Sequence, residues 1–173
     1  MMFSSVQSRF CIAAIALSFA IAGCGTNTLP SATDDPIAAL QTGECLDCTL
    51  TGADLAEADL AEAVLNRSDL SRSTLDNADL SNALMDGVNL SGATLNGATL
   101  TRAALTNANL DGASLTAADL SGAYLKGATL TGTDFTNANL SGANLTDTNL
   151  DAAILDGANL EGALLPEGFT PPQ

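Results

Sequence analysis

Residues 108–145 read ANLDGASLTAADLSGAYLKGATLTGTDFTNANLSGANL, and one five-residue pattern recurs through this stretch without a gap. The pattern continues in both directions, so that residues 46–165 form 24 consecutive blocks. The last residue of each block is large and apolar: 22 are Leu, and the other two are Met85 and Phe135. Two places earlier stands a small residue, which is Ala in 18 of the blocks. The repeat therefore predicts a structure built block by block.

The length of the block excludes ordinary secondary structure. A five-residue period fits neither an α-helix, with about 3.6 residues per turn, nor a strand, whose side chains alternate with a period of about 2. All eleven glycines within residues 46–165 occupy one slot, two places after the large apolar residue. Gly and Asn tolerate the positive φ that the second central residue of a type II turn requires. We therefore expect a turn in every block, with two of five side chains pointing inward.

Segments such as Ala53-Asp54-Leu55, Ala108-Asn109-Leu110 and Ser141-Gly142-Ala143-Asn144-Leu145 resemble the motif A(D/N)LXX of the pentapeptide-repeat family. The resemblance covers residues 46–165. It implies an all-β fold, a right-handed quadrilateral (four-sided) β-helix with four blocks per coil, and hence about six coils. At about 4.8 Å per coil the rod would be about 29 Å long.

The residue just before each large apolar residue, here called the ladder position, is expected to face outward. It is mostly Asp, Asn or Thr, and its six apolar occupants are Val64, Leu84, Ala104, Tyr124, Ile154 and Leu164. Five of the six share one 20-residue phase, as a four-sided coil predicts, and only Asn144 interrupts it. An exposed apolar strip on an acidic rod can mark a contact with an unknown protein partner or a homodimer, with Tyr124 and Leu84 as anchors. Stacking between coils, or cover from a terminal segment, are the alternatives.

The first 23 residues have the features of an export signal. A single charge, Arg9, precedes fourteen uncharged residues, which are too few for a spanning helix of about 20 residues. The sequence Ile21-Ala22-Gly23-Cys24 then resembles the lipobox of bacterial lipoproteins. The resemblance implies cleavage before Cys24 and acylation of its side chain and amino group, which anchors the protein in the lipid bilayer. Gly25 resembles the signal for the outer membrane, so we expect an exported protein facing the periplasm, with the outer membrane favoured over the plasma membrane.

Short segments flank the repeat. Residues 24–45 are expected to comprise the lipidated Cys, a flexible linker and a short capping helix that begins at Asp35-Pro36 and stops at Gly43. Residues 166–173 form a C-terminal tail, in which we expect Phe169 to fold over the last coil. The predicted division is thus 1–23 signal peptide, 24–45 linker and cap, 46–165 β-helix and 166–173 tail.

Composition limits the chemistry. The net charge is −15, from 20 acidic and 5 basic residues, which argues against nucleic acid as a partner because phosphate binding needs Lys and Arg. The chain has no His and few aromatic residues, and it offers no recognisable pair of catalytic carboxylates. We therefore expect no enzyme, no cofactor and no metal site. One outward phase could form a carboxylate ladder, but we expect a solvated face there: Asp59, Asp79, Thr99, Asp119, Asn139 and Asn159.

Cys45 and Cys48 form a C-x-x-C pair where the repeat begins, and both fall on inward positions. A disulfide that locks the N-terminal end is one interpretation, since the envelope is oxidising. Buried thiols are the second, and redox or metal chemistry is the third. Similar pairs occur in some cyanobacterial pentapeptide-repeat proteins.

The sequence thus predicts a membrane-anchored envelope lipoprotein whose β-helix is a non-enzymatic structural or protein-interaction module. The alternative is an acidic DNA mimic of the kind that protects DNA gyrase. The export signal disfavours that alternative, because an exported lipoprotein does not meet a cytoplasmic topoisomerase.

Overall fold

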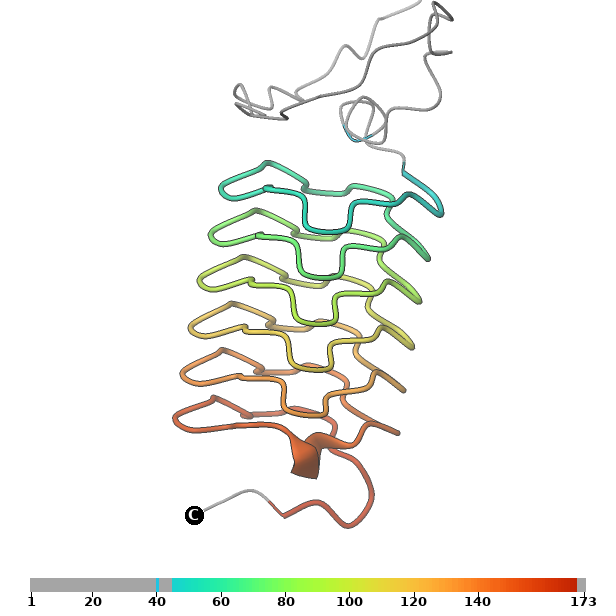
Figure 1. Ribbon diagram of the computed structural model, residues 1–173. Helices are drawn as coiled ribbons and strands as arrows, with labels where there is room; N and C mark the ends of the chain where they lie inside the picture. Colours follow the sequence, from blue (N-terminus) through green and yellow to red (C-terminus); the bar gives the residue numbers. More distant parts are fainter. Residues whose placement is uncertain (1–39, 41–44, 171–173) are drawn as a thin grey trace, which may run out of the picture.

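The computed structural model describes Leu40 and residues 45–170, and in it the repeat winds into a stack of coils (Figure 1). From Thr49↔Asp69 to Asn144↔Leu164, each ladder residue except Thr129 forms a parallel β-bridge with the residue 20 positions later. A coil therefore takes four blocks, and residues 46–165 make six coils. The expected four-sided β-helix is confirmed. Its strands are single bridged residues rather than longer segments.

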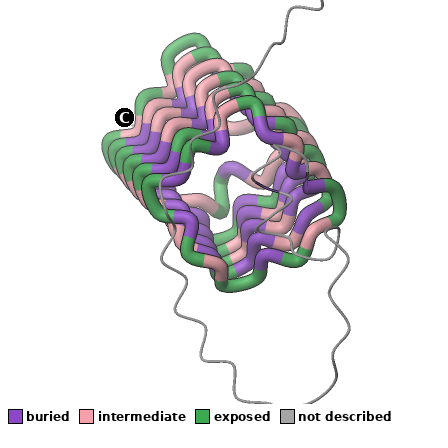
Figure 2. Tube along the Cα trace, turned by 90° about the horizontal axis from the view of Figure 1, so that it is seen from above, coloured by how far each residue is buried: buried purple, intermediate pink, exposed green. Residues whose placement is uncertain are grey.

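Backbone hydrogen bonds join each coil to the next in both directions. The N–H of Leu50 donates to the carbonyl oxygen of Asp69 (2.7 Å), and the N–H of Asp69 donates to that of Cys48 (2.8 Å). The same pair of bonds recurs around the coil and along the stack. Viewed from above, the coils superimpose into one outline whose exposed stretches recur at the corners (Figure 2).

The interior consists of the two inward positions of every block. The large apolar residues from Leu50 to Leu150 are buried, and so are most of the small residues two places before them. Burial of such side chains is worth about 1.5–3 kcal/mol each, and the small partner leaves room for close stacking of successive coils. The last coil has no neighbour below it, so Leu155, Leu160 and Leu165 are only partly buried. Phe169 packs against the core at this end, as expected.

The turn slot has the predicted backbone conformation. Every residue two places after a large apolar residue, from Asp47 to Gly162, has positive φ, with the single exception of Ala152. Around that exception the regular turn is replaced by a short 3-10 helix, η1 (Leu150–Ala152). The N–H of Leu130 then donates to the side-chain Oδ1 of Asn149 (2.7 Å), whereas the equivalent N–H groups of the other coils donate to a backbone carbonyl oxygen.

The expected capping helix lies outside the described residues, apart from Leu40, which is buried against the core. The leader and Cys24 also lie outside them. Within Leu40 and residues 45–170, η1 is the only helical segment longer than one residue, and no helix there is long and apolar enough to cross a membrane.

Candidate functional site

The β-helix stacks five of the six apolar ladder residues, together with Asn144, into one column. Successive bridges join Val64 to Leu84, Leu84 to Ala104, Ala104 to Tyr124, Tyr124 to Asn144, and Asn144 to Leu164. We call this column the apolar strip. Its backbone groups are engaged in bonds between coils; the N–H of Tyr124, for example, donates to the carbonyl oxygen of Ala103 (2.9 Å). Only its side chains are therefore available to a partner.

Large and small side chains alternate along the strip. Leu84, Tyr124 and Leu164 are 45%, 54% and 57% exposed. Val64, at the N-terminal end of the strip, and Ala104 and Asn144, between the three, are less exposed. Neighbouring coils lie about 4.8 Å apart, so the large side chains project about 10 Å from one another. The strip is thus a row of three apolar projections separated by shallow steps.

The other three columns of ladder residues are polar, and each carries carboxylates. One contains Asp69, another contains Asp54 and Asp134, and the third contains Asp59, Asp79 and Asp119. Ile154 lies on the second of these columns, where it bridges Asp134 and is 45% exposed. The apolar strip is the only one of the four described columns without a charged residue.

Two ion pairs lie on the corner that follows the strip. Arg67 donates to Asp47, one coil earlier, through Nε (2.7 Å) and Nη2 (2.6 Å), and Lys126 lies 3.5 Å from Asp147. The hydrogen bond from Arg67 lowers the pKa of Asp47. Both pairs are exposed to solvent and contribute little stability, but they neutralise charge beside the strip.

The carboxylates on the polar columns accept hydrogen bonds from other residues of the rod. Ser71 donates to Asp69, and Thr136 donates to Asp134 through its backbone N–H (2.8 Å) as well as its hydroxyl. These bonds, led by the side-chain hydroxyls, lower the pKa of both carboxyls. Asp119 accepts a bond from Asn139 in the next coil (3.0 Å). Among the described residues no group of three His, Cys, Asp or Glu is arranged to hold a metal ion.

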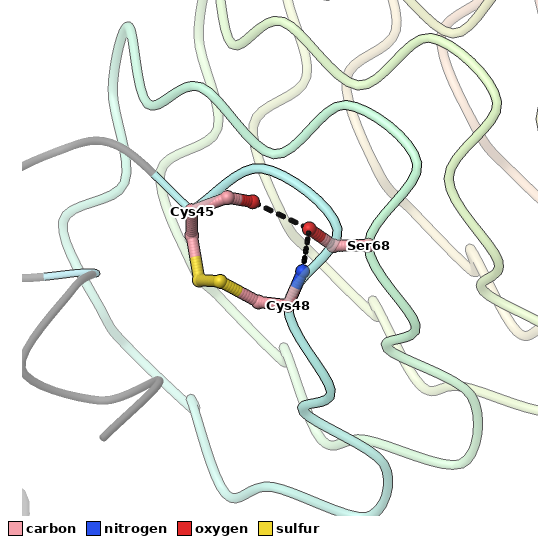
Figure 3. The surroundings of a disulfide bond; sticks show 3 residues. All are labelled: Cys45, Cys48 and Ser68. Atoms are coloured by element: carbon pink, nitrogen blue, oxygen red, sulfur yellow. Dashed lines mark hydrogen bonds between the residues drawn. A yellow bond between two sulfur atoms is a disulfide. The ribbon is translucent and has the colours of Figure 1, made fainter. Parts of the chain in front are cut away.

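At the N-terminal end of the rod, the sulfurs of Cys45 and Cys48 form a disulfide, with 5.4 Å between their Cα atoms (Figure 3). Ser68, in the second coil, forms hydrogen bonds with the backbones of both cysteines. Its hydroxyl donates to the carbonyl oxygen of Cys45 and accepts the N–H of Cys48 (3.1 Å). The disulfide thus bridges one corner at the start of the first coil and is hydrogen-bonded to the second.

The sequence reasoning missed one exposed apolar residue, Leu46, which is 56% exposed. It lies in a turn just after Cys45, at a position that is polar in most blocks. An apolar residue at this otherwise polar position is the sequence signal for it, and this position is not a ladder position.

The family model for pentapeptide repeats (8 copies) matches residues 45–87, 83–122, 113–151 and 143–167. Among solved structures, the chain is similar to a pentapeptide repeat protein from the cyanobacterium Cyanothece 51142, with 27% identity over 75% of this chain and 97% of that one (TM-score 0.32). It is similar to HetL from the cyanobacterium Nostoc sp. strain PCC 7120, a protein involved in heterocyst differentiation regulation, with 29% identity over 73% and 88% (TM-score 0.30). A third similar structure is alr5209 of Nostoc, with 37% identity over 53% and 77% (TM-score 0.31). No curated protein matches the chain.

Proposed function

Because the chain belongs to the pentapeptide-repeat family, whose members are generally non-enzymatic structural modules, we propose that it is a protein-interaction module of a bacterial envelope. In this proposal acylated Cys24 anchors the chain in a membrane, and the apolar strip binds the partner. The observation that carries the proposal is the strip itself: three large, half-exposed apolar side chains in one column of an acidic rod.

Exposure of these side chains supports a contact role. Isolated apolar residues on a protein surface are common, but a column of them on an otherwise charged molecule is not. The coils do not need them, because the interior is filled by the inward residues and the backbone ladder holds the stack. Tyr and Leu on a rigid backbone lose little conformational freedom when a partner covers them.

The leader sequence supports the membrane anchor. Two or three acyl chains on Cys24 would give stable attachment, whereas one chain alone would give only weak binding. From Cys24 to Asp35, where the expected capping helix begins, the chain advances 11 residues. At most about 3.6 Å per residue, this segment can span up to about 40 Å, so the rod can work at some distance from the membrane surface.

The anchor is tested by mass spectrometry of the mature N-terminus combined with cell fractionation. We expect a chain that begins at Cys24, carries acyl groups and sediments with membranes. An unmodified Cys24 in a soluble cytosolic fraction would overturn the anchor and the envelope function together.

The contact is tested by placing a photo-reactive amino acid at position 124 of the full chain and irradiating intact cells. We expect a cross-linked product of defined mass. The matched control carries the same group at position 154, which is also exposed but lies on another column. If position 124 gives no product, or if both positions give the same products, the strip is not a contact surface.

A further inference from the structure

Building on the proposed function, we infer that the occupant of the apolar strip is a second copy of this chain, docked antiparallel across a two-fold axis. The axis lies between the coils of Ala104 and Tyr124. In this register Val64 faces Leu164 of the second copy, Leu84 faces Asn144, and Ala104 faces Tyr124.

Shape carries the inference, because every facing pair joins a large projecting side chain to a smaller, half-buried one. Two copies in parallel register would instead place Leu84 on Leu84 and Tyr124 on Tyr124, with gaps between. Shifting the antiparallel register by one coil would bring large side chains together and shorten the overlap. The antiparallel register with full overlap is thus the arrangement in which the alternation along the strip complements itself.

The centre of this contact has a specific geometry. The two Tyr124 rings come from facing copies at neighbouring coil levels, which are separated by about 4.8 Å. Aromatic rings attract each other in offset arrangements with centroids about 4.5–7 Å apart. Each ring thus covers Ala104 of the other copy and lies beside the other ring.

Electrostatics favours this face over the other three. Each full chain has a net charge of −15, so two copies repel, and the repulsion is least where no ladder residue is charged. The two-fold axis brings like corners together, so Arg67, which pairs with Asp47 of its own chain, comes to the level of Glu167 of the second copy. Asp86 comes to the level of Asp147, which Lys126 partly neutralises, whereas Glu62 meets Glu161 with like charge. The rim is mixed, and the apolar strip supplies the attraction.

The contact is small. Six strip positions extend about 24 Å, and a strip one residue wide is well below the ~800 Å² per partner of a standard stable interface. We expect a weak, reversible dimer that membrane anchoring strengthens by raising the effective concentration. The antiparallel rods have their N-terminal ends apart, but a linker that reaches about 40 Å is longer than the ~29 Å rod. Both anchors can therefore reach one membrane.

Thiol cross-linking tests this arrangement. Full-length chains carrying Leu84→Cys and Asn144→Cys are purified separately, mixed in lipid vesicles and oxidised. We expect a disulfide-linked dimer in the mixture at a yield at least several-fold above either chain alone. In the proposed dimer equal positions lie three coils, about 14 Å, apart along the rod. The control mixture carries Thr74→Cys and Asp134→Cys, which have the same 60-residue separation on another column.

A second measurement covers the possibility that these substitutions weaken the dimer. The chain has one tyrosine and no tryptophan, so Tyr124 dominates its fluorescence and near-ultraviolet circular dichroism. In the unsubstituted chain we expect both signals to change over the concentration range in which the mass doubles.

The inference is overturned if Leu84→Cys alone cross-links as well as the mixture, because the copies are then parallel. It is also overturned if the mass doubles without a change in the Tyr124 signals, or if no dimer forms at all. If position 124 cross-links in cells to a different macromolecule and the 84/144 pair fails, the second copy is wrong while the proposed contact function stands.

Discussion

At the scale of single residues, the turn slot shows how the sequence fixes the backbone. Eleven of its 24 occupants are Gly, yet Ala117 adopts φ +57° in the same slot. Left-handed backbone costs a residue with a Cβ about 1–2 kcal/mol, which the surrounding ladder must offset. The N–H of Ala117 is held by the carbonyl oxygen of Thr136 (2.9 Å).

Replacing Ala117 with Gly should therefore stabilise the protein by about 0.5–1 kcal/mol, because relief of the left-handed backbone exceeds the entropy that Gly loses on folding. The reverse change one coil earlier, Gly97→Ala, should destabilise it by about 1 kcal/mol or more. There the new Cβ would stand 2.7 Å from Oδ1 of Asn77, which has to move. Denaturant unfolding of the two variants checks this prediction, and equal signs for the two changes would contradict it.

The hydroxyl of Thr136 should control the titration of Asp134. Removing it in Thr136→Ala should raise the pKa of Asp134 toward its ordinary value, because the largest cause of the lowering is lost. A carboxyl with a lowered folded-state pKa stabilises above its unfolded pKa and loses that contribution as the pH falls through the folded value. The difference in free energy of unfolding between the wild type and Thr136→Ala should thus be largest near neutral pH, at under about 1 kcal/mol, and should disappear below about pH 4.

NMR titration of Asp134, together with unfolding at several pH values, measures both effects. Thr94→Ala is the control, because the hydroxyl of Thr94 has no hydrogen-bond partner among the described residues. A gap that is independent of pH would show that the hydroxyl acts on packing rather than on the charge.

At the scale of elements, the block was predictable and its single irregularity was not. Five-residue spacing sets which side chains point inward, so the core and the strip follow from position alone. At η1 (Leu150–Ala152) the spacing is unbroken, yet the turn changes, and the side chain of Asn149 replaces a backbone acceptor. The last coil has no following coil to bond with, and the turn slot here holds Ala152, whereas Gly157 and Gly162 in the same coil keep the regular turn. The ion pair of Arg67 with Asp47 likewise depends on side-chain rotamers that the repeat does not specify.

Ser68 should stabilise the N-terminal coil more than an otherwise similar serine does. Ser68→Ala removes the acceptor for the N–H of Cys48 and a bond between coils, so we expect a loss of about 1–2 kcal/mol. Ser73 is equally buried in the equivalent slot, but its hydroxyl bonds only within its own block, to the carbonyl oxygen of Leu70 (2.7 Å). The backbone N–H of residue 73 also donates to that carbonyl oxygen and still does so after the change. Ser73→Ala should therefore lower the free energy of unfolding by less than about 1 kcal/mol. Thermal unfolding compares them, and a larger loss in Ser73→Ala would contradict the role of Ser68.

At the scale of the whole molecule, each coil contacts only its neighbours, as in other repeat proteins, so the value of a residue depends on its place along the rod. Leu100 is fully buried with coils on both sides, whereas Leu160 lies in the last coil and is partly buried. Leu100→Ala should cost about 2–5 kcal/mol, and Leu160→Ala less than half as much. Hydrogen exchange should show the second variant loosening the C-terminal coil alone. Equal losses from both changes would mean that the rod unfolds without regard to its ends.

The net charge acts on the whole molecule too. Twenty carboxylates oppose association, while the one uncharged column of ladder residues permits it. Association therefore depends on the apolar strip alone. The sequence predicts which residues form the strip, because residues 20 apart stack. Only the structure shows that more and less exposed side chains alternate along it.

The most direct test of that surface is sedimentation equilibrium of the full-length chain in detergent micelles. We expect a reversible monomer–dimer equilibrium for the wild type and for Ile154→Ser, an exposed apolar residue outside the strip. The double variant Leu84→Ser/Tyr124→Ser should remain a folded monomer over the same range of concentration. A dimer that persists in the double variant, or a wild type that stays monomeric at every concentration, would contradict the account.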